Sequence, residues 1–363
     1  MSQLDAYDYT LPRELIAQHP LPNRVDARLM VVDRATQTID HYHVRDLPEL
    51  LRAEDVLVRN DSRVIPARLI GRREQTGGRW QGLFLRVDEE TGVWELLSKT
   101  RGRLVEGELI VVEDRDGRDG LLMAVVGRLG GNLLVRPLET PDGHPDPQAT
   151  DVGTLLQRYG RVPIPPYIRD GHMVDSDLER YQTVYASEQP EDCRSVAAPT
   201  AGLHFTDGLL KQIAKGQTSL ASVTLHVGVG TFRPIGVDKL EEHEMHAEWG
   251  RLDEENATVI ADRRSGGGRC VAIGTTSVRV LESAASHHHG DIQPWTGMTD
   301  LFIRPPYSFA AVDCLMTNFH LPKSSLIVLV SAFAGHELTM RAYQEAVESE
   351  YRFYSYGDAM LIV

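Results

Sequence analysis

Short apolar runs alternate with turn-forming residues between positions 80 and 137. The gaps between these runs are rich in glycine and aspartate, as in "DRDGRDG" and "GRLGG". Runs of this length and spacing are typical of antiparallel strands joined by tight turns. The pattern therefore predicts a small antiparallel β-barrel, built from "WQGLFLRV", "VWELL", "GELIVVED", "LLMAVVG" and "NLLVRPL".

The rest of the chain mixes strand patterns with helical periods, which indicates an α/β fold. "SVTLHVGVG" and "RCVAIGTT" are expected strands, whereas "ENATVIADRR", "SVRVLESAAS" and "HELTMRAYQEAVESE" have helical spacing. A stretch rich in proline and aspartate, "ETPDGHPDPQATD", separates the β-unit from the helix-like "VGTLLQRYG". We therefore expect a discontinuous, mixed α/β main domain of residues 1–66 and 152–363, with a β-barrel domain inserted as residues 67–151.

Composition narrows the possible settings of the protein. The 363 residues carry a formal net charge of −14, which argues against a surface that is basic all round. The amino end is acidic without an apolar core, and the apolar run near residue 330 is too short to span a bilayer. We expect a cytoplasmic protein without a membrane contact. Cys193, Cys270 and Cys314 are few and widely spaced, so we expect free thiols.

Histidine-rich segments do not have metal-site spacing. In "EEHEMHAEW", His243 and His246 are three positions apart, whereas a zinc-binding H-E-x-x-H helix needs a spacing of four. The triple histidine at 287–289 is most simply a solvated loop. We therefore expect no metal.

One stretch runs against the acidic balance of the chain. Between residues 59 and 79, six arginines face two acids. Such arginines either bind phosphates or pair with carboxylates elsewhere in this acidic protein, and the sequence leaves both readings open. The candidates for phosphate binding are Arg63, Arg68, Arg72 and Arg73.

Residues 195–206, "SVAAPTAGLHFT", combine many small side chains with Pro199 and Gly202. Small residues let a ligand approach the backbone, and the two breakers predict a loop. We expect Asp207 to cap the helix "GLLKQIAK" that follows. His204 would then be delivered to a ligand, although on this stretch alone a packed and hydrogen-bonded histidine is the simpler reading.

Three other segments bring polar residues to the ends of expected strands. In "RCVAIGTTSVRVLES", a strand is followed by a Gly-Thr-Thr-Ser turn and a helix, an arrangement that suits a carboxylate or phosphate. "TLHVGVGTFRP" carries His226 but lacks the third glycine of G-x-G-x-x-G. "LMTNFHLPKSSLIVLVSAFAG" places polar side chains, His320 among them, before an apolar run that should be buried.

Taken together, the longest motifs closely resemble those of the S-adenosylmethionine:tRNA ribosyltransferase-isomerase family of the queuosine pathway. The resemblance covers nearly the whole chain, and its motifs are long and irregular. They include "YDYTLPRELIAQHPLPNRVDARLMV", "NDSRVIPARL", "GRVPIPPYI", "ERYQTVYA", "SVAAPTAGLHFT", "LHVGVGTFRPI", "HEMHAE", "GTTSVRVLES", "TDLFIRPPYSF", "TNFHLPKSSLIVLVSAFAG" and "YRFYSYGDAMLI".

The resemblance implies that the ribosyl part of S-adenosylmethionine moves to the aminomethyl group of 7-aminomethyl-7-deazaguanine at the tRNA wobble position. Epoxyqueuosine-tRNA, adenine and methionine would result. It also implies an α/β domain with an inserted β-barrel, tRNA as partner, and S-adenosylmethionine as co-substrate with no further cofactor. We expect a monomer.

This chemistry suggests roles for the polar residues. Because a sulfonium acidifies the neighbouring C5′ hydrogens, the reaction needs a base, and departing adenine needs a proton donor. His204, His226 and His320 are the candidate catalytic residues. Thr275 to Ser277 would hold the methionine carboxylate, and Tyr307 or Phe319 would face the sulfonium. The expected substrate-binding residues are Thr200, Gly202, Thr206, Gly228, Gly230, Thr231, Thr275, Thr276, Ser277, Tyr307, Thr317, Asn318, Phe319 and Lys323. Arg63, Arg68, Arg72 and Arg73 would hold tRNA phosphates.

Three alternative functions make different predictions. A tRNA-binding protein without catalysis would release no adenine. A methyltransferase would form S-adenosylhomocysteine and should carry a glycine-rich nucleotide loop after its first strand, which the sequence lacks. A metal-dependent hydrolase would lose activity with a chelator.

Overall fold

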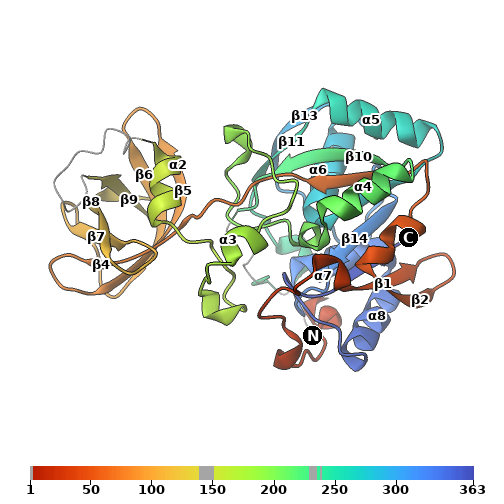
Figure 1. Cartoon of the computed structure of the whole chain (residues 1–363), viewed down its shortest axis with the longest axis horizontal. Coiled ribbons are helices and arrows are strands. Elements are labelled where there is room, and N and C mark those ends of the chain that lie inside the picture. The colour runs from red at the N-terminus through yellow and green to blue at the C-terminus, as the bar shows by residue number, and fades with distance from the viewer. Residues whose placement is uncertain (1–2, 139–150, 229–234, 238) are drawn as a thin grey trace. The chain divides into compact units, whose positions relative to one another are not determined.

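The computed structural model describes residues 3–138, 151–228, 235–237 and 239–363. The chain divides into two compact units. The main unit comprises Met1–Val64, Pro165–His172 and Glu179–Val363, and the barrel unit comprises Ile65–Ile164 and Met173–Leu178. Figure 1 shows the helices and strands of both units.

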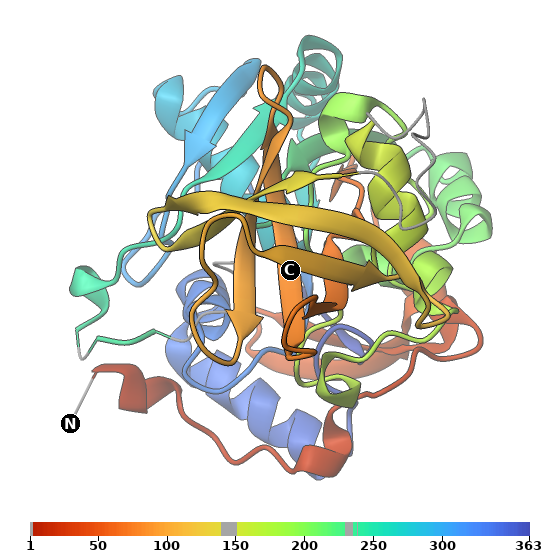
Figure 2. The ribbon, with the colours of Figure 1, turned by 90° about the vertical axis from the view of Figure 1, so that its left-hand side faces the viewer.

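The barrel unit is built around a closed ring of antiparallel strands in the order β4-β5-β6-β9-β8-β7, drawn in orange to yellow in Figure 2. Side chains alternate between the interior and the surface, so that Trp80 and Phe84 of β5 are buried. The interior is tight, because a Cβ on Gly71 would lie 2.1 Å from the carbonyl oxygen of Val111. This ring confirms the predicted barrel. Its strands are β4 (Arg68–Arg73), β5 (Arg79–Asp88), β6 (Val93–Thr100), β7 (Leu109–Glu113), β8 (Asp119–Leu129) and β9 (Asn132–Pro137).

The boundary of the barrel unit differs from the one expected at residue 151. Helix α2 (Val152–Tyr159) and the chain up to Ile164 group with the barrel. The buried ring of Tyr159 lies so close to Gly120 of β8 that a Cβ there would be 2.3 Å away. The backbone of Arg161 exchanges two hydrogen bonds with that of Arg68 at the start of β4. The apolar face of α2 and this bridge explain why the unit extends past the predicted boundary.

The main unit contains a mixed sheet of nine strands among its described residues, in the order β13-β11-β10-β3-β12-β14-β15-β1-β2. Its four central strands, β10, β3, β12 and β14, run parallel to one another. The strands are β1 (Arg28–Asp33), β2 (Thr38–His43), β3 (Val56–Asn60), β10 (Ser219–Leu225), β11 (Glu248–Leu252), β12 (Cys270–Ile273), β13 (Trp295–Thr299), β14 (Cys314–Asn318) and β15 (Ala359–Ile362).

Alternate residues of the sheet's strands, such as β1 and β12, enter two different cores, one on each face of the sheet. Met30 and Ala272 join the core that includes buried residues of α5, α6, α7 and α8. Leu29 and Val271 join the core that includes residues of α1 and α4. This three-layer arrangement confirms the predicted α/β class. The helices are α1 (Leu47–Leu50), α3 (Asp177–Arg180), α4 (Asp207–Lys215), α5 (Glu254–Ser265), α6 (Gly274–His287), α7 (Ser325–Ala334) and α8 (His336–Glu348).

The parallel order has a direct consequence for function. The carboxyl ends of β10, β3, β12 and β14 all lie at one edge of the sheet, called here the carboxyl edge. Ligands of open α/β sheets bind at this edge, because strand-to-helix connections there leave polar groups unused. The segments that follow these strands are the natural place to look for a site.

Candidate functional site

A cavity of about 330 Å³ lies at the carboxyl edge of the main unit. Its volume is in the range of small-molecule sites. Segments that are distant in sequence form its walls, including the end of β14 and the beginnings of α6 and α7. The cavity is lined by Pro166, Tyr167, Tyr181, Ala197, Ala198, Pro199, Thr200, Ala201, Val227, Gly274, Thr275, Thr276, Thr317, Asn318, Phe319, His320, Leu321, Pro322, Lys323, Ser324, Ser325, Leu326, Tyr354 and Ser355.

Helix α6 begins at the cavity wall, directly after β12. Gly274 has φ of +83°, so the chain turns into the helix within one residue, without the separate turn expected from the sequence. No side chain of the described residues caps this helix, and its first-turn amides are therefore available to an anion. Thr275 and Thr276 line the cavity, and Oγ1 of Thr276 is buried without a hydrogen-bond partner among the described residues. Ser277 differs, since its Oγ donates to the carbonyl of Ile273 at 2.7 Å.

Helix α7 also begins at the cavity. The hydroxyl of Ser324 caps it by accepting from the amide of Ile327 at 3.4 Å, and Ser325 follows on the lining. Lys323 adopts a left-handed backbone conformation with φ of +57°. Its ammonium pairs with Asp5 at 3.1 Å and with Asp8 at 2.9 Å, so the N-terminal segment is tied to the cavity rim.

His320 lies on the cavity wall beyond the end of β14. Its Nε2 lies 2.9 Å from the hydroxyl of Thr317, and its backbone amide donates to the phenolic oxygen of Tyr343. Burial lowers the pKa of His320 to about 3, because a charged imidazolium loses its hydration there. The ring is therefore neutral at physiological pH.

A hydrogen-bond chain runs from the cavity into the protein behind it. Thr200 donates to Oδ1 of Asn318 at 2.9 Å, and Nδ2 of Asn318 donates to Nε2 of His204 at 3.2 Å. His204 therefore carries its proton on Nδ1. Burial, with the charges of Arg24 and Arg352, lowers its pKa to about 4. His204 lies outside the lining and contacts Asn318 from behind, so the structure does not deliver it to the cavity as the sequence suggested.

The stretch 195–206 is not simply a loop, because Thr200–His204 form a short 3₁₀ helix. A Cβ on Gly202 would lie 2.1 Å from the hydroxyl of Tyr185, so this glycine accommodates a protein side chain. Thr206 caps α4 by accepting from the amide of Leu209 at 3.2 Å, one residue before the expected cap at Asp207. The small residues at positions 197–201 of this stretch line the cavity and form part of its wall.

The segment after β10 contributes Val227 to the lining, whereas its histidine turns elsewhere. The ring of His226 stacks on Trp249 with centroids 4.6 Å apart. Burial is the main reason why the pKa of His226 falls to about 4. Gly228 donates its amide to Oε1 of Glu248 at 2.7 Å. The two other predicted residues of this segment, Gly230 and Thr231, lie outside the described residues.

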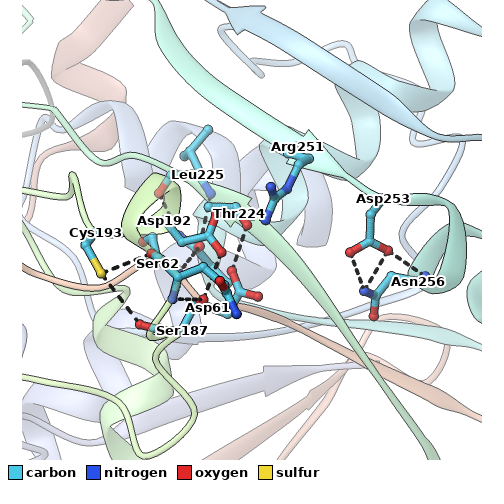
Figure 3. A network of polar contacts seen from close by, with 12 residues as sticks. Asp61, Ser62, Ser187, Asp192, Cys193, Thr224, Leu225, Arg251, Asp253 and Asn256 are labelled. Carbon is cyan, nitrogen blue, oxygen red and sulfur yellow. Dashed lines mark hydrogen bonds and ion pairs between the residues drawn. The ribbon is translucent and has the colours of Figure 1, made fainter.

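A second polar cluster follows β3 and β10 at the same edge (Figure 3). Asp61 accepts from the hydroxyl of Thr224 at 2.8 Å. Asp192 is held by Arg251 and by the hydroxyl of Ser187, each at 2.8 Å. Burial, with the nearby charge of Asp192, raises the pKa of Asp61 to about 6. This cluster closes its hydrogen bonds within the protein and lies outside the cavity lining.

Two predicted aromatic residues have different surroundings. Phe319 lines the cavity, as expected. Tyr307 does not, because its hydroxyl donates to Glu282 at 3.2 Å in another part of the main unit. Glu282 also accepts hydrogen bonds from the backbone amides of residues 310–312, so Tyr307 belongs to a hydrogen-bond network around this buried carboxylate.

Sequence reasoning missed the aromatic wall formed by Tyr167, Tyr181 and Tyr354. The rings of Tyr167 and Tyr354 are stacked with centroids 4.3 Å apart. Burial raises the pKa of Tyr167 to about 12, so its hydroxyl stays protonated. The three tyrosines occur in "GRVPIPPYI", "ERYQTVYA" and "YRFYSYGDAMLI", and the presence of these motifs was the available signal.

The four arginines proposed for tRNA phosphates all have partners within the protein. Arg63 donates to the carbonyls of residues 186 and 187, and Arg68 donates to that of Ile164. Arg72 pairs with Asp119 and Arg73 with Glu108, each at 2.5 Å. The geometry favours the reading in which these arginines are structural, and their contact with RNA stays a prediction.

Other expectations concern the membrane, metals and thiols. No helix in the part of the chain that the structure describes is long and apolar enough to cross a membrane. The same residues contain no group of three histidines, cysteines or acids placed to hold a metal ion. The three cysteines are free, as predicted.

Comparisons with known proteins agree with the motifs. A relative from Symbiobacterium thermophilum, named S-adenosylmethionine:tRNA ribosyltransferase-isomerase, is 50% identical over 365 residues, which cover 99% of this chain and 100% of the relative. The crystal structure of an S-adenosylmethionine tRNA ribosyltransferase from Thermotoga maritima is also similar, with 34% sequence identity and a TM-score of 0.54. The match covers 99% of this chain and 100% of the Thermotoga chain. The model of the queuosine biosynthesis protein family matches residues 4–362. These matches confirm the resemblance and the transferase class: the chain belongs to the queuosine biosynthesis protein family.

Proposed function

We propose that the protein transfers and isomerises the ribosyl moiety of S-adenosylmethionine onto 7-aminomethyl-7-deazaguanine at the tRNA wobble position. The products are epoxyqueuosine-tRNA, adenine and methionine. The observation that carries this proposal is the cavity, where helix N-termini face an aromatic wall in a chain whose full-length relative has the corresponding name.

The cavity suits the charges of S-adenosylmethionine. The free amides of α6, with the hydroxyls of Thr275 and Thr276, are donors for the methionine carboxylate. The stacked rings of Tyr167 and Tyr354 on the lining provide an environment that attracts a sulfonium and stacks on adenine.

His320 is the best of the three predicted histidines for a direct role in proton transfer. It lines the cavity, whereas His204 and His226 lie outside the lining. Its neutral imidazole can accept a proton, so by its position His320 is the candidate for the base that removes an acidified C5′ hydrogen. Bound substrate would have to raise its pKa from about 3 for this transfer to be efficient. Thr317 would hold the ring in one orientation through its 2.9 Å contact.

The test of the proposed function is a product analysis. S-adenosylmethionine and tRNA that carries the aminomethyl-deazaguanine base are incubated with the protein, and the small molecules are separated by chromatography. Adenine and methionine should appear together and in equal amounts. Formation of S-adenosylhomocysteine, or no turnover with correctly modified tRNA, would refute the assignment.

Variants of two histidines test the role of His320. His320→Gln should lower kcat by about a hundredfold to ten-thousandfold, the usual range for a lost acid or base. His204→Gln is the matched control, because glutamine can still accept the hydrogen bond from Asn318. A larger loss of kcat in His204→Gln than in His320→Gln would indicate that His204, and not His320, acts as the base.

A further inference from the structure

A small hollow on the main unit gathers arginine side chains beside the cavity. Arg24 and Arg180 line it, together with His204 and Ser355. Arg352 lies near enough to act electrostatically on His204. We call Arg24, Arg180 and Arg352 the arginine cluster. Ser355 lines both the hollow and the cavity, so the two share a wall residue.

Backbone carbonyls hold the guanidinium groups of the arginine cluster. Arg24 donates to the carbonyls of Gln182 at 2.9 Å and Glu179 at 3.1 Å. Arg180 donates through one nitrogen to the carbonyls of Leu21 and Pro22. Arg352 donates to that of His19. These bonds fix the positions of the groups without neutralising their charge.

Carboxylates do not compensate the arginine cluster. No carboxylate among the described residues forms an ion pair, with nitrogen and oxygen within 4.0 Å, with Arg24, Arg180 or Arg352. Glu179 acts on Arg24 from a greater distance, and Asp358 acts on Arg352 while bound to Arg28. Burial and the neighbouring charge of Arg180 lower the pKa of Arg24, which shows that the arrangement is costly. An anion would offset this cost.

The size of the hollow limits what the anion can be. The hollow is small and open, with a volume of about 20 Å³, so it suits a group that sits at its mouth better than a molecule enclosed within it. The anion must lie across the opening as part of a larger molecule. In a protein with a net charge of −14, a local positive patch is also where a polyanion is directed.

We propose that the arginine cluster binds the phosphate backbone of tRNA next to the nucleotide that enters the cavity. This inference rests on the proposed function, and it replaces the arginines of residues 63–73 as the main phosphate contact. Three of those four have an acidic partner: Arg72 and Arg73 pair with Asp119 and Glu108 at 2.5 Å, and Arg63 lies 3.9 Å from Glu188. Arg68 donates to the carbonyl of Ile164 within the barrel unit. The arginine cluster instead keeps its charge beside the shared wall formed by Ser355.

Salt-dependent binding of an unmodified tRNA transcript tests the proposal. Arg180→Ala should weaken binding several-fold at 0.1 M salt and lower the slope of log K against log salt by about one. Arg180→Lys keeps the charge and should keep most of the slope. Arg118→Ala is the matched control and should leave the slope unchanged. This exposed barrel arginine has one ion-pair partner among the described residues, its neighbour Asp116 at 3.2 Å.

Arg72→Ala is the rival arm of the same experiment. If it lowers the slope while Arg180→Ala does not, the proposal is overturned and the phosphate contact lies on the barrel unit. Melting temperatures of all variants are measured alongside. Adenine release by the wild-type protein is measured separately, so a protein that forms no adenine but shows the Arg180 effect refutes the proposed function and not this surface.

A measurement on the wild-type protein covers the case in which Arg180→Ala fails to fold. Phenylglyoxal modifies accessible arginines, and mass spectrometry follows each site with and without bound tRNA. The tRNA transcript should slow modification of Arg180 at least threefold and leave Arg118 unaffected. Equal modification rates of Arg180 in both conditions would overturn the proposal.

Discussion

The two edges of the parallel strands treat the same kinds of residue in opposite ways. At the carboxyl edge, Thr276 keeps a hydroxyl without a partner among the described residues, and the amides of α6 are uncapped. At the opposite edge, Asp55 precedes β3, is fully buried, and accepts from the side chain of Arg269 at 2.7 Å and from the amide of Arg52 at 2.9 Å. The part of the carboxyl edge at the cavity leaves donors unused, whereas the opposite edge completes its hydrogen bonds at Asp55.

This difference separates residues that stabilise the fold from residues that are left available for a ligand. Burial alone would raise the pKa of Asp55, but its bonds to Arg269 and Arg52 lower it overall, so the carboxylate stays charged. At the carboxyl edge, burial instead holds His204 and His320 neutral. A buried charge with complete partners supports the fold, while neutral and unpaired groups leave room for a ligand to supply the missing interaction.

The largest effect is expected from breaking the fully paired edge. Asp55→Ala leaves the guanidinium of Arg269 half-buried without its partner, and should lower the free energy of unfolding by about 3–5 kcal/mol. Urea denaturation of the whole protein, compared between the variant and the wild type, measures this loss. Adenine release per folded molecule should not change, because Asp55 is at the opposite edge. A loss below about 1 kcal/mol would mean that the two edges do not differ in this way.

A smaller effect is expected from pH, and it should arise at the carboxyl edge. The folded pKa values of His204 and His320, about 4 and 3, lie below the ordinary value of 6.5. The unfolded chain therefore binds more protons as pH falls below 6.5, and stability decreases by up to about 1.4 kcal/mol per pH unit for each histidine. The ion pair of Asp55, whose pKa is lowered, is lost only at lower pH.

Denaturation curves between pH 7 and pH 5 measure this slope. His204→Gln cannot take up the proton, so its stability should fall less steeply than that of the wild type. An identical slope in His204→Gln would show that other groups control stability in this range.

The smallest effect is expected from an unpaired hydroxyl. Thr276→Val should change the melting temperature little, because the removed Oγ1 has no partner in the described structure. It should raise the Kd for S-adenosylmethionine about tenfold, as expected for a lost hydrogen bond to a charged group. Isothermal titration measures both affinity and enthalpy.

Ser277→Ala is the matched control one residue along the same helix. Its hydroxyl already donates to Ile273, so its loss should cost the fold up to about 1 kcal/mol and leave the Kd unchanged. Weaker ligand binding in Ser277→Ala than in Thr276→Val would reverse the assignment of these two side chains.

Much of the fold was predictable because periodicity reflects burial directly. Short apolar runs separated by turn-forming residues indicated the barrel strands from residue 80, and helical spacing of apolar residues indicated α5, α6 and α8. Strand β4 escaped this reading because the arginines of "RLIGRR" obscure its apolar positions. The extent of the barrel unit was also missed, since the packing of Tyr159 against Gly120 is a contact between distant residues.

The site was predictable only where residues follow a strand. Thr275, Thr317 and Asn318 come at or after the ends of parallel strands, and topology brings them together. The aromatic wall could not be foreseen, because nothing local indicates that Tyr167, Tyr181 and Tyr354 meet. The direction of His204 depends on one turn of 3₁₀ helix, which small residues neither require nor forbid.

The pairing of the first strand with the last has a consequence for synthesis on the ribosome. β1 (Arg28–Asp33) lies between β2 and β15 (Ala359–Ile362), and β3 must wait for β10 and β12, which follow the whole barrel sequence. The barrel can fold as a unit while the main sheet is still incomplete. Tyr354 and Ser355 come just before β15, so a nascent chain gains its cavity only after these residues have left the ribosome, long after the barrel sequence.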